Sequence, residues 1–174
     1  MHRRSFLSGL VALSILPKAH AASFEFPDLN VYTAQGKEIN LSTILKEYSG
    51  KPLLLHAWAS YCRPCIADIP ILQDLETSIS SLGIYFMNNS LDEDLGIIQT
   101  IQQKERYQGK NIFLPQSSQK ILLESYQKQI GHKFVIPAYF ILSEEGTCIL
   151  IEEGTLGSKE RLQRIKSRIE ELLN

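Results

Sequence analysis

Two cysteines separated by two residues, Cys62 and Cys65, are the residues of this chain whose types and spacing point most directly to chemistry. They lie where an apolar, strand-like run over 52–57 gives way to a helix-like run over 66–75. At such a junction both side chains share one face of the first helical turn, and their Cα atoms come within the ~4.4–6.8 Å that a disulfide spans. The pattern therefore predicts a redox-active dithiol.

The two thiols are expected to have different roles. Cys62 lies beside the free N–H groups and the positive dipole end of the helix, which favour the thiolate and place its pKa below the usual ~8.5. Arg63, between the cysteines, adds a positive charge that also favours the thiolate. We therefore expect Cys62 to attack and Cys65, deeper by helix geometry, to resolve the mixed disulfide.

Other uses of the cysteines are constrained by the rest of the sequence. A structural zinc site needs four ligands, and the sequence has no second closely spaced Cys/His pair. We expect the Cys62–Cys65 disulfide to be the redox group, with no cofactor and no metal. Cys148, on a predicted strand, is expected to be a small buried hydrophobe.

Length and composition fit an ordinary globular protein. The 174 residues carry a formal net charge of −1 and contain three cysteines. This length predicts one domain with a well-buried core. The absence of a basic tract argues against nucleic-acid binding, and so few cysteines argue against a disulfide-stapled secreted scaffold.

The first 21 residues have the features of an export signal. Arg3 and Arg4 precede an apolar run over 7–16, and the run ends in a possible cleavage site over 19–21. The arginine pair followed by Ser-Phe-Leu resembles a twin-arginine signal, and a general secretory signal is the alternative. We expect a cleavable signal over 1–21, a single domain over 22–174 and a periplasmic mature protein.

The residues around the cysteines resemble a known family. The run from Trp58 to Cys65, WASYCRPC, followed by Asp68 and Pro70, is similar to the pattern WA-x-WC-x-PC-x-x-E-x-P of the TlpA/ResA-like periplasmic thioredoxins. The segment 136–142 is similar to the proline loop of that family and the strand after it. The chain departs from the family pattern at three places, which are Tyr61 for tryptophan, Asp68 for glutamate, and Ala138-Tyr139 for Thr-Thr.

This resemblance implies roles for residues outside the cysteine pair. Pro137 would follow a cis peptide bond in a loop beside the cysteines. Ile136 would present its backbone to an extended substrate segment, which is a form of β-strand addition. Asp68 would influence the thiols and relay protons, the alternative being a surface helix carboxylate. Trp58 would pack beside the site and contact substrate.

His56 has two readings. It falls where cytoplasmic thioredoxins carry a buried aspartate, so it could assist proton transfer to Cys65. The alternative is a hydrogen-bonded core histidine without a catalytic role. His132, just before the proline loop, is expected at the surface.

The order of predicted elements fits the same family. Apolar periodicity and turn residues predict a hairpin over 24–41, a short helix capped by Ser42, a buried strand over 53–59, a helix over 62–80, a strand over 84–88, a helix over 92–107, a strand over 111–114, a helix over 118–130, strands over 139–142 and 147–151, and a helix over 158–173 capped by Ser158. The fold class is therefore α/β, a thioredoxin fold with an N-terminal β-hairpin extension and a central αβ insertion.

The resemblance implies a periplasmic thiol-disulfide oxidoreductase that works as a reductase. Its partners would be disulfide-bearing exported proteins, such as apocytochromes c or copper-site assembly proteins, and a membrane thiol that supplies electrons. We expect the protein to be a monomer. The alternative is a copper(I)-binding metallochaperone on the same fold, because copper(I) is a soft ion suited to thiolates.

Overall fold

The structure, a computed structural model, describes residues 24–92, 94–105 and 110–172. The export signal predicted over 1–21 lies outside these residues. Within the described part, no helix combines the length and the apolar character that a membrane span requires.

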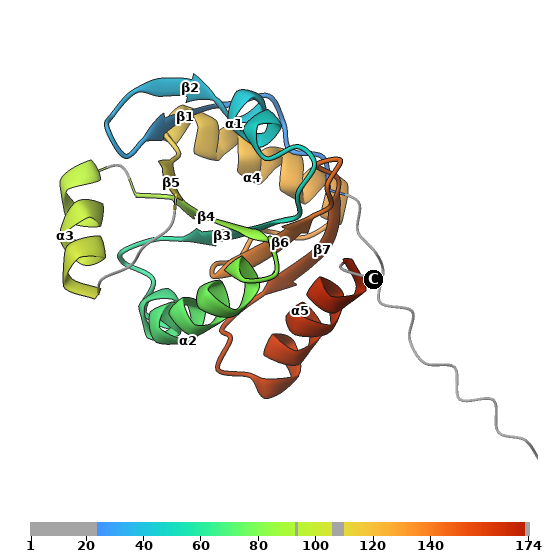
Figure 1. The fold of residues 1–174 in the computed structure, drawn as a ribbon. Coiled ribbons are helices and arrows are strands. Elements are labelled where there is room, and N and C mark those ends of the chain that lie inside the picture. Colours follow the sequence, from blue (N-terminus) through green and yellow to red (C-terminus); the bar gives the residue numbers. More distant parts are fainter. Residues whose placement is uncertain (1–23, 93, 106–109, 173–174) are drawn as a thin grey trace, which may run out of the picture.

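A seven-stranded mixed sheet forms the centre of the described part, with strand order β2-β1-β5-β4-β3-β6-β7. The strands are β1 (Asn30–Thr33), β2 (Glu38–Asn40), β3 (Leu53–Trp58), β4 (Tyr85–Ser90), β5 (Lys110–Phe113), β6 (Ala138–Leu142) and β7 (Cys148–Glu153). The helices are α1 (Leu41–Glu47), α2 (Arg63–Ser80), α3 (Leu95–Glu105), α4 (Gln116–Ile130) and α5 (Lys159–Leu172). Helices α2 and α5 cover one face of the sheet, and α1 and α4 lie over the other (Figure 1).

Strand β3 is the central element that positions the cysteines. It pairs in parallel with β4 and antiparallel with β6, and all six of its residues are buried. A strand covered on both faces takes a continuous apolar run, which explains Leu53-Leu54-Leu55. The chain leaves the end of this strand through a short turn and enters α2, so the cysteines lie at the C-terminal edge of the sheet.

The predicted thioredoxin fold with two additions is confirmed. β3-α2-β4, α4 and β6-β7-α5 form the thioredoxin core, the hairpin β1-β2 is the N-terminal extension, and α3-β5 is the central insertion. The structure adds that the two additions pair with each other. β5 is parallel to β4 on one side and antiparallel to β1 on the other, with Tyr32 opposite Phe113. The extension and the insertion thus complete one edge of the sheet together.

Two helix starts differ from the prediction. Helix α1 is capped by Asn40 rather than Ser42, because β2 runs directly into the helix and the Asn40 side chain accepts the N–H of Ser42 at 2.8 Å. Helix α3 begins at Leu95 rather than near residue 92, because the Asp92 carboxylate is bound elsewhere and Asp94 caps the N–H of Gly96 at 2.8 Å. At α5 the predicted cap is confirmed, since the Ser158 hydroxyl accepts the N–H of Arg161 at 3.4 Å.

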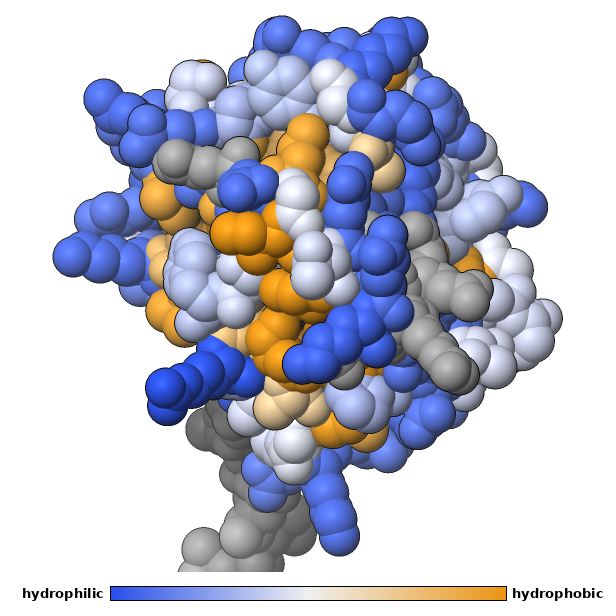
Figure 2. Space-filling model, turned by 90° about the vertical axis from the view of Figure 1, so that its left-hand side faces the viewer, coloured by the Kyte–Doolittle hydropathy of each residue, from blue (hydrophilic) through white to orange (hydrophobic). Residues whose placement is uncertain are grey.

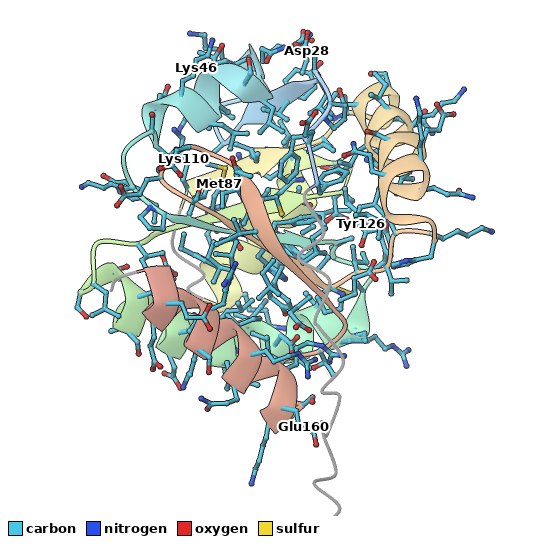
Figure 3. The ribbon with its side chains drawn as sticks, turned by 90° about the vertical axis from the view of Figure 1, so that its right-hand side faces the viewer. Asp28, Lys46, Met87, Lys110, Tyr126 and Glu160 are labelled. Atoms are coloured by element: carbon cyan, nitrogen blue, oxygen red, sulfur yellow. A yellow bond between two sulfur atoms is a disulfide. The ribbon has the colours of Figure 1, made fainter. Side chains whose placement is uncertain are left out.

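The core under α4 is aromatic. Tyr126 lies between α4 and the sheet (Figure 3), with its ring 5.4 Å from Phe24 and 4.9 Å from Phe134. Cys148 is buried, as expected, and burial raises the pKa of its thiol to about 12. A thiol with so high a pKa is unreactive near neutral pH, so Cys148 acts as a packing residue.

Candidate active site

The predicted cysteine pair is joined in a disulfide at the start of α2. The Cα atoms of Cys62 and Cys65 are 5.2 Å apart. Cys62 is the N-cap of α2, and its Sγ accepts the N–H of Cys65 at 3.2 Å. Cys65 is completely buried, whereas Cys62 is 8% exposed. Cys62 is therefore the less buried of the two cysteines, in agreement with the role predicted for it.

A tight turn carries the chain from β3 to Cys62. The N–H of Cys62 donates to the C=O of Ala59 at 3.1 Å, so Ser60 and Tyr61 form the corners of this turn. Tyr61 is 70% exposed beside the disulfide. Trp58 is completely buried, which removes it from the surface that a substrate contacts in this conformation. Trp58 is therefore part of the core beneath the site, and Tyr61 is the aromatic residue of this segment that lies at the surface.

The proline loop lies at the same edge of the sheet. The Ile136–Pro137 bond is cis, as the family resemblance implied. Ala138 pairs with Ala57, which places Pro137 next to the end of β3 and the turn that follows it. The C=O of Pro137 accepts the N–H of Gly154 at 2.7 Å, so the loop is tied to the end of β7.

Glu153 holds the residues before the proline. Its carboxylate accepts the N–H of Val135 at 3.0 Å and is 2.7 Å from Nε2 of His132, which is exposed as expected. Among the described residues, none forms a hydrogen bond with the backbone N–H or C=O of Ile136. Those two groups are therefore available to an extended chain that approaches the loop.

Asp68 is buried rather than exposed, so the alternative of a surface carboxylate is wrong. The side chain is 1% exposed. It accepts hydrogen bonds from the Tyr139 hydroxyl at 2.7 Å, from the Leu156 N–H at 2.8 Å and from the Thr155 hydroxyl. These donors, from β6 and the segment after β7, were not predicted from the sequence. The one available signal was Tyr139 itself, because a buried tyrosine hydroxyl needs a hydrogen-bond partner.

His56 lies in the buried layer beneath α2. Its Nδ1 is 3.1 Å from Oδ1 of Asn88, and its ring stacks on Tyr139 at 5.0 Å between centroids. Burial lowers the pKa of His56 to about 4, although Asn88 and the charge of Asp68 act in the opposite direction. The imidazole is therefore neutral near pH 7. Its surroundings are those expected for the second interpretation, a hydrogen-bonded histidine in the core.

The active-site edge of the molecule has an apolar surface. Figure 2 faces the side on which α3 lies and α2 begins, and a band of apolar residues runs down the middle of this face between hydrophilic borders. Two exposed hydrophobic side chains on elements at this edge are Ile97 of α3 and Val135 of the proline loop. An apolar surface beside a reactive disulfide suits contact with a polypeptide.

The surroundings of the cysteines bear on metal binding as well. Across residues 24–92, 94–105 and 110–172, no group of three or more His, Cys, Asp or Glu side chains is placed to hold a metal ion. In this part of the chain, a copper(I) ion at the site would have the two cysteine sulfurs as its ligands.

Comparisons with known proteins agree with this arrangement. The Redoxin family matches residues 21–168. The thiol-disulfide oxidoreductase ResA of Oceanobacillus iheyensis is 37% identical over 57 residues, which cover 32% of this chain and 30% of that protein. The ResA of Bacillus thuringiensis is 25% identical over 150 residues, which cover 83% of this chain and 76% of that protein.

Solved structures show the same fold. A thiol:disulfide interchange protein of Chlorobium tepidum superposes with a TM-score of 0.63 at 20% identity, covering 90% of this chain and 100% of that one. A secreted disulfide oxidoreductase of Mycobacterium tuberculosis superposes with a TM-score of 0.60 at 17% identity, covering 83% of this chain and 96% of that one.

We expect His56 to make stability depend on pH. Its folded-state pKa of about 4 lies below the ordinary 6.5, so the unfolded chain binds a proton that the folded chain does not. The stabilisation is complete above about pH 6.5 and is lost as the pH falls towards 4, by at most about 3 kcal/mol. Denaturant unfolding of wild type and His56→Asn should be measured across this pH range. As the pH falls, the free energy of unfolding of wild type should decrease steadily relative to that of His56→Asn. A difference that stays constant with pH would contradict the assignment.

We expect the two active-site thiols to differ in reactivity. In single variants that keep one of them, Cys65→Ser and Cys62→Ser, the alkylation rate near neutral pH should be at least ~10-fold higher for Cys62, because Cys65 is completely buried. The rate for Cys62 should titrate below ~8.5. Cys148 is present in both variants and serves as the internal control. Slower alkylation of Cys62 than of Cys65 would reverse the two roles.

Proposed function

The chain belongs to the Redoxin family and is a TlpA/ResA-like thiol-disulfide oxidoreductase of thioredoxin fold, and from this premise we propose that it is a periplasmic reductase of disulfides in exported proteins. The observation that carries the proposal is that Cys62, the less buried cysteine, lies at the same edge of the sheet as Ile136, whose backbone N–H and C=O form no hydrogen bond within the described residues. A disulfide in an extended segment can add to Ile136 as a strand and present a sulfur to Cys62. The substrate is therefore recognised mainly through its main chain.

The reduction proceeds in two exchanges. In the reduced protein, the Cys62 thiolate attacks one sulfur of the substrate disulfide, forms a mixed disulfide and releases the other substrate sulfur as a thiolate. The Cys65 thiolate then attacks Sγ of Cys62, which forms the Cys62–Cys65 disulfide and releases the second substrate thiolate. Two electrons pass to the substrate, and each released thiolate takes a proton. A membrane thiol donor restores the dithiol by the reverse exchange.

Buried negative charge near the dithiol supports the reductive direction. Asp68 lies one helical turn beyond Cys65 and is buried with it. A carboxylate there disfavours a second negative charge, so it makes the thiolate less stable. A less stable thiolate gives a less oxidising couple than that of strong oxidants of this fold, whose reduced form is strongly stabilised.

The export proposal rests on the N-terminal sequence. Arg3 and Arg4, the apolar run over 7–16 and the small residues at 19–21 form the proposed signal. A similar solved protein from Mycobacterium tuberculosis is described as secreted. An exported location would give the reductase access to proteins that acquire disulfides outside the cytoplasm.

We expect Cys65→Ser to trap the substrate. Without Cys65 the mixed disulfide on Cys62 cannot be resolved, so exported proteins with cysteine pairs should accumulate as adducts in the periplasmic fraction. The control is the double variant Cys62→Ser/Cys65→Ser, which should trap none. Adducts confined to the cytoplasmic fraction would contradict export, and equal adduct formation in the control would contradict the dithiol mechanism.

We expect the reduction potential of the Cys62–Cys65 couple to lie nearer the ~−270 mV of thioredoxin than the ~−120 mV of a strong oxidant. Equilibration of the purified protein against a glutathione series, followed by alkylation, measures it. A potential above ~−160 mV would overturn the reductive direction while leaving the thiol-disulfide activity in place.

A further inference from the structure

A second buried carboxylate, outside the predicted site, holds the active-site turn. Asp92 follows β4 and is 7% exposed. It accepts the N–H and the hydroxyl of Ser60 at 2.7 and 2.5 Å, and the hydroxyl of Ser90 at 2.7 Å. Ser60 is the first corner of the turn that ends at Cys62. The carboxylate therefore fastens the segment that carries Cys62 to the end of the neighbouring strand.

Within the described part of the chain, the Asp92 carboxylate is held by uncharged hydrogen-bond donors. Among the described residues, no lysine, arginine or histidine forms an ion pair with it, and its partners are a backbone N–H and two hydroxyls. An unpaired buried charge is costly, and a neutral side chain could accept hydrogen bonds from the same donors. Holding the turn in place therefore does not by itself explain why a carboxylate, rather than a neutral acceptor, occupies this position.

The reacting sulfur belongs to the residue that closes the turn held by this carboxylate. Ser60 and Cys62 are two residues apart, so their Cα atoms lie within about 7 Å. Over roughly 10 Å in a partly buried site, a unit charge changes the pKa of a thiol by on the order of one unit. A carboxylate raises it, because it opposes the thiolate.

The other titratable groups named around the dithiol differ from Asp92 in their surroundings. Arg63 is exposed on the first turn of α2, and Asp68 is occupied by donors from β6 and the segment after β7. His56 is neutral near pH 7, and Glu153 is bound to the proline loop. Among these groups, Asp92 is the one whose carboxylate is bonded directly to the turn that leads into Cys62.

We propose that Asp92 is a positioning residue for the dithiol, which fixes the turn before Cys62 through Ser60 and places a buried negative charge beside the attacking sulfur. The charge partly offsets the pull of the helix terminus on the thiolate. Cys62 then remains nucleophilic, because attacking strength falls as thiol pKa falls. The inference rests on the dithiol chemistry and is independent of the direction in which electrons flow.

The test compares Asp92→Asn with Asp94→Asn in the Cys65→Ser background. Asp94 is an exposed carboxylate two residues away that caps α3, so its variant is the matched control. Alkylation rate against pH should show the Cys62 pKa lowered by at least ~0.5 unit in Asp92→Asn, about 3-fold more thiolate well below the pKa, and unchanged in Asp94→Asn. Equal pKa values in the two variants would overturn the proposal.

Two further measurements separate charge from positioning. Ser60→Ala keeps the carboxylate and removes one hydrogen bond, so it should shift the pKa of Cys62 by less than half as much as Asp92→Asn. A full shift from Ser60→Ala would show that the charge has no part. If Asp92→Asn does not fold, carbon-13 NMR of the Asp92 carboxyl in the Cys65→Ser protein should show an inflection at the Cys62 pKa, and its absence would overturn the proposal.

Discussion

The geometry of the site depends on where the central strand stops. β3 is buried on both faces and hydrogen-bonded on both sides, so its last residue has a fixed place in the molecule. The turn closed by the hydrogen bond from Cys62 N–H to Ala59 C=O fixes the start of α2 relative to that strand. A dithiol at a helix N-terminus needs this kind of anchorage, because thiolate stabilisation by free N–H groups depends on their orientation.

Two buried carboxylates extend this anchorage to the loops around the dithiol. Asp68 joins α2 to Tyr139 on β6 and to Leu156 after β7, while Asp92 joins the end of β4 to Ser60. Each accepts hydrogen bonds from elements that are distant in sequence. The turn before Cys62 and the helix that carries Cys65 are therefore each tied to a neighbouring element by a carboxylate, which gives stronger hydrogen bonds than a neutral acceptor.

Much of this arrangement could be read from local sequence, and part of it could not. The cysteine spacing and the apolar run before it located the disulfide, because a strand-to-helix junction is a local feature. The family resemblance supplied the cis bond before Pro137. The hydrogen bonds of Asp92 to Ser60 and of Asp68 to Tyr139 join residues 32 and 71 positions apart. No spacing rule covers such pairs, because they form only when the sheet brings separate strands together.

The cap of α1 shows the same limit at short range. A serine one residue inside the helix and an asparagine just before it are equally good caps by type. The choice of Asn40 depends on β2 ending at that residue, which is set by its pairing with β1. This helix boundary depends on the pairing of strands, so a local sequence pattern predicts it only to within a few residues.

The pairing of β1 with β5 gives the N-terminal hairpin a protective task. Without β1, one side of β5 would present unpaired N–H and C=O groups at the rim of the sheet. Open rims of this kind recruit strands from other molecules and start aggregation. The hairpin instead leaves the three-residue β2 as the outermost strand, and a short terminal strand is a poor template for such recruitment. The extension thus covers a strand edge that would otherwise be open to pairing with a second molecule.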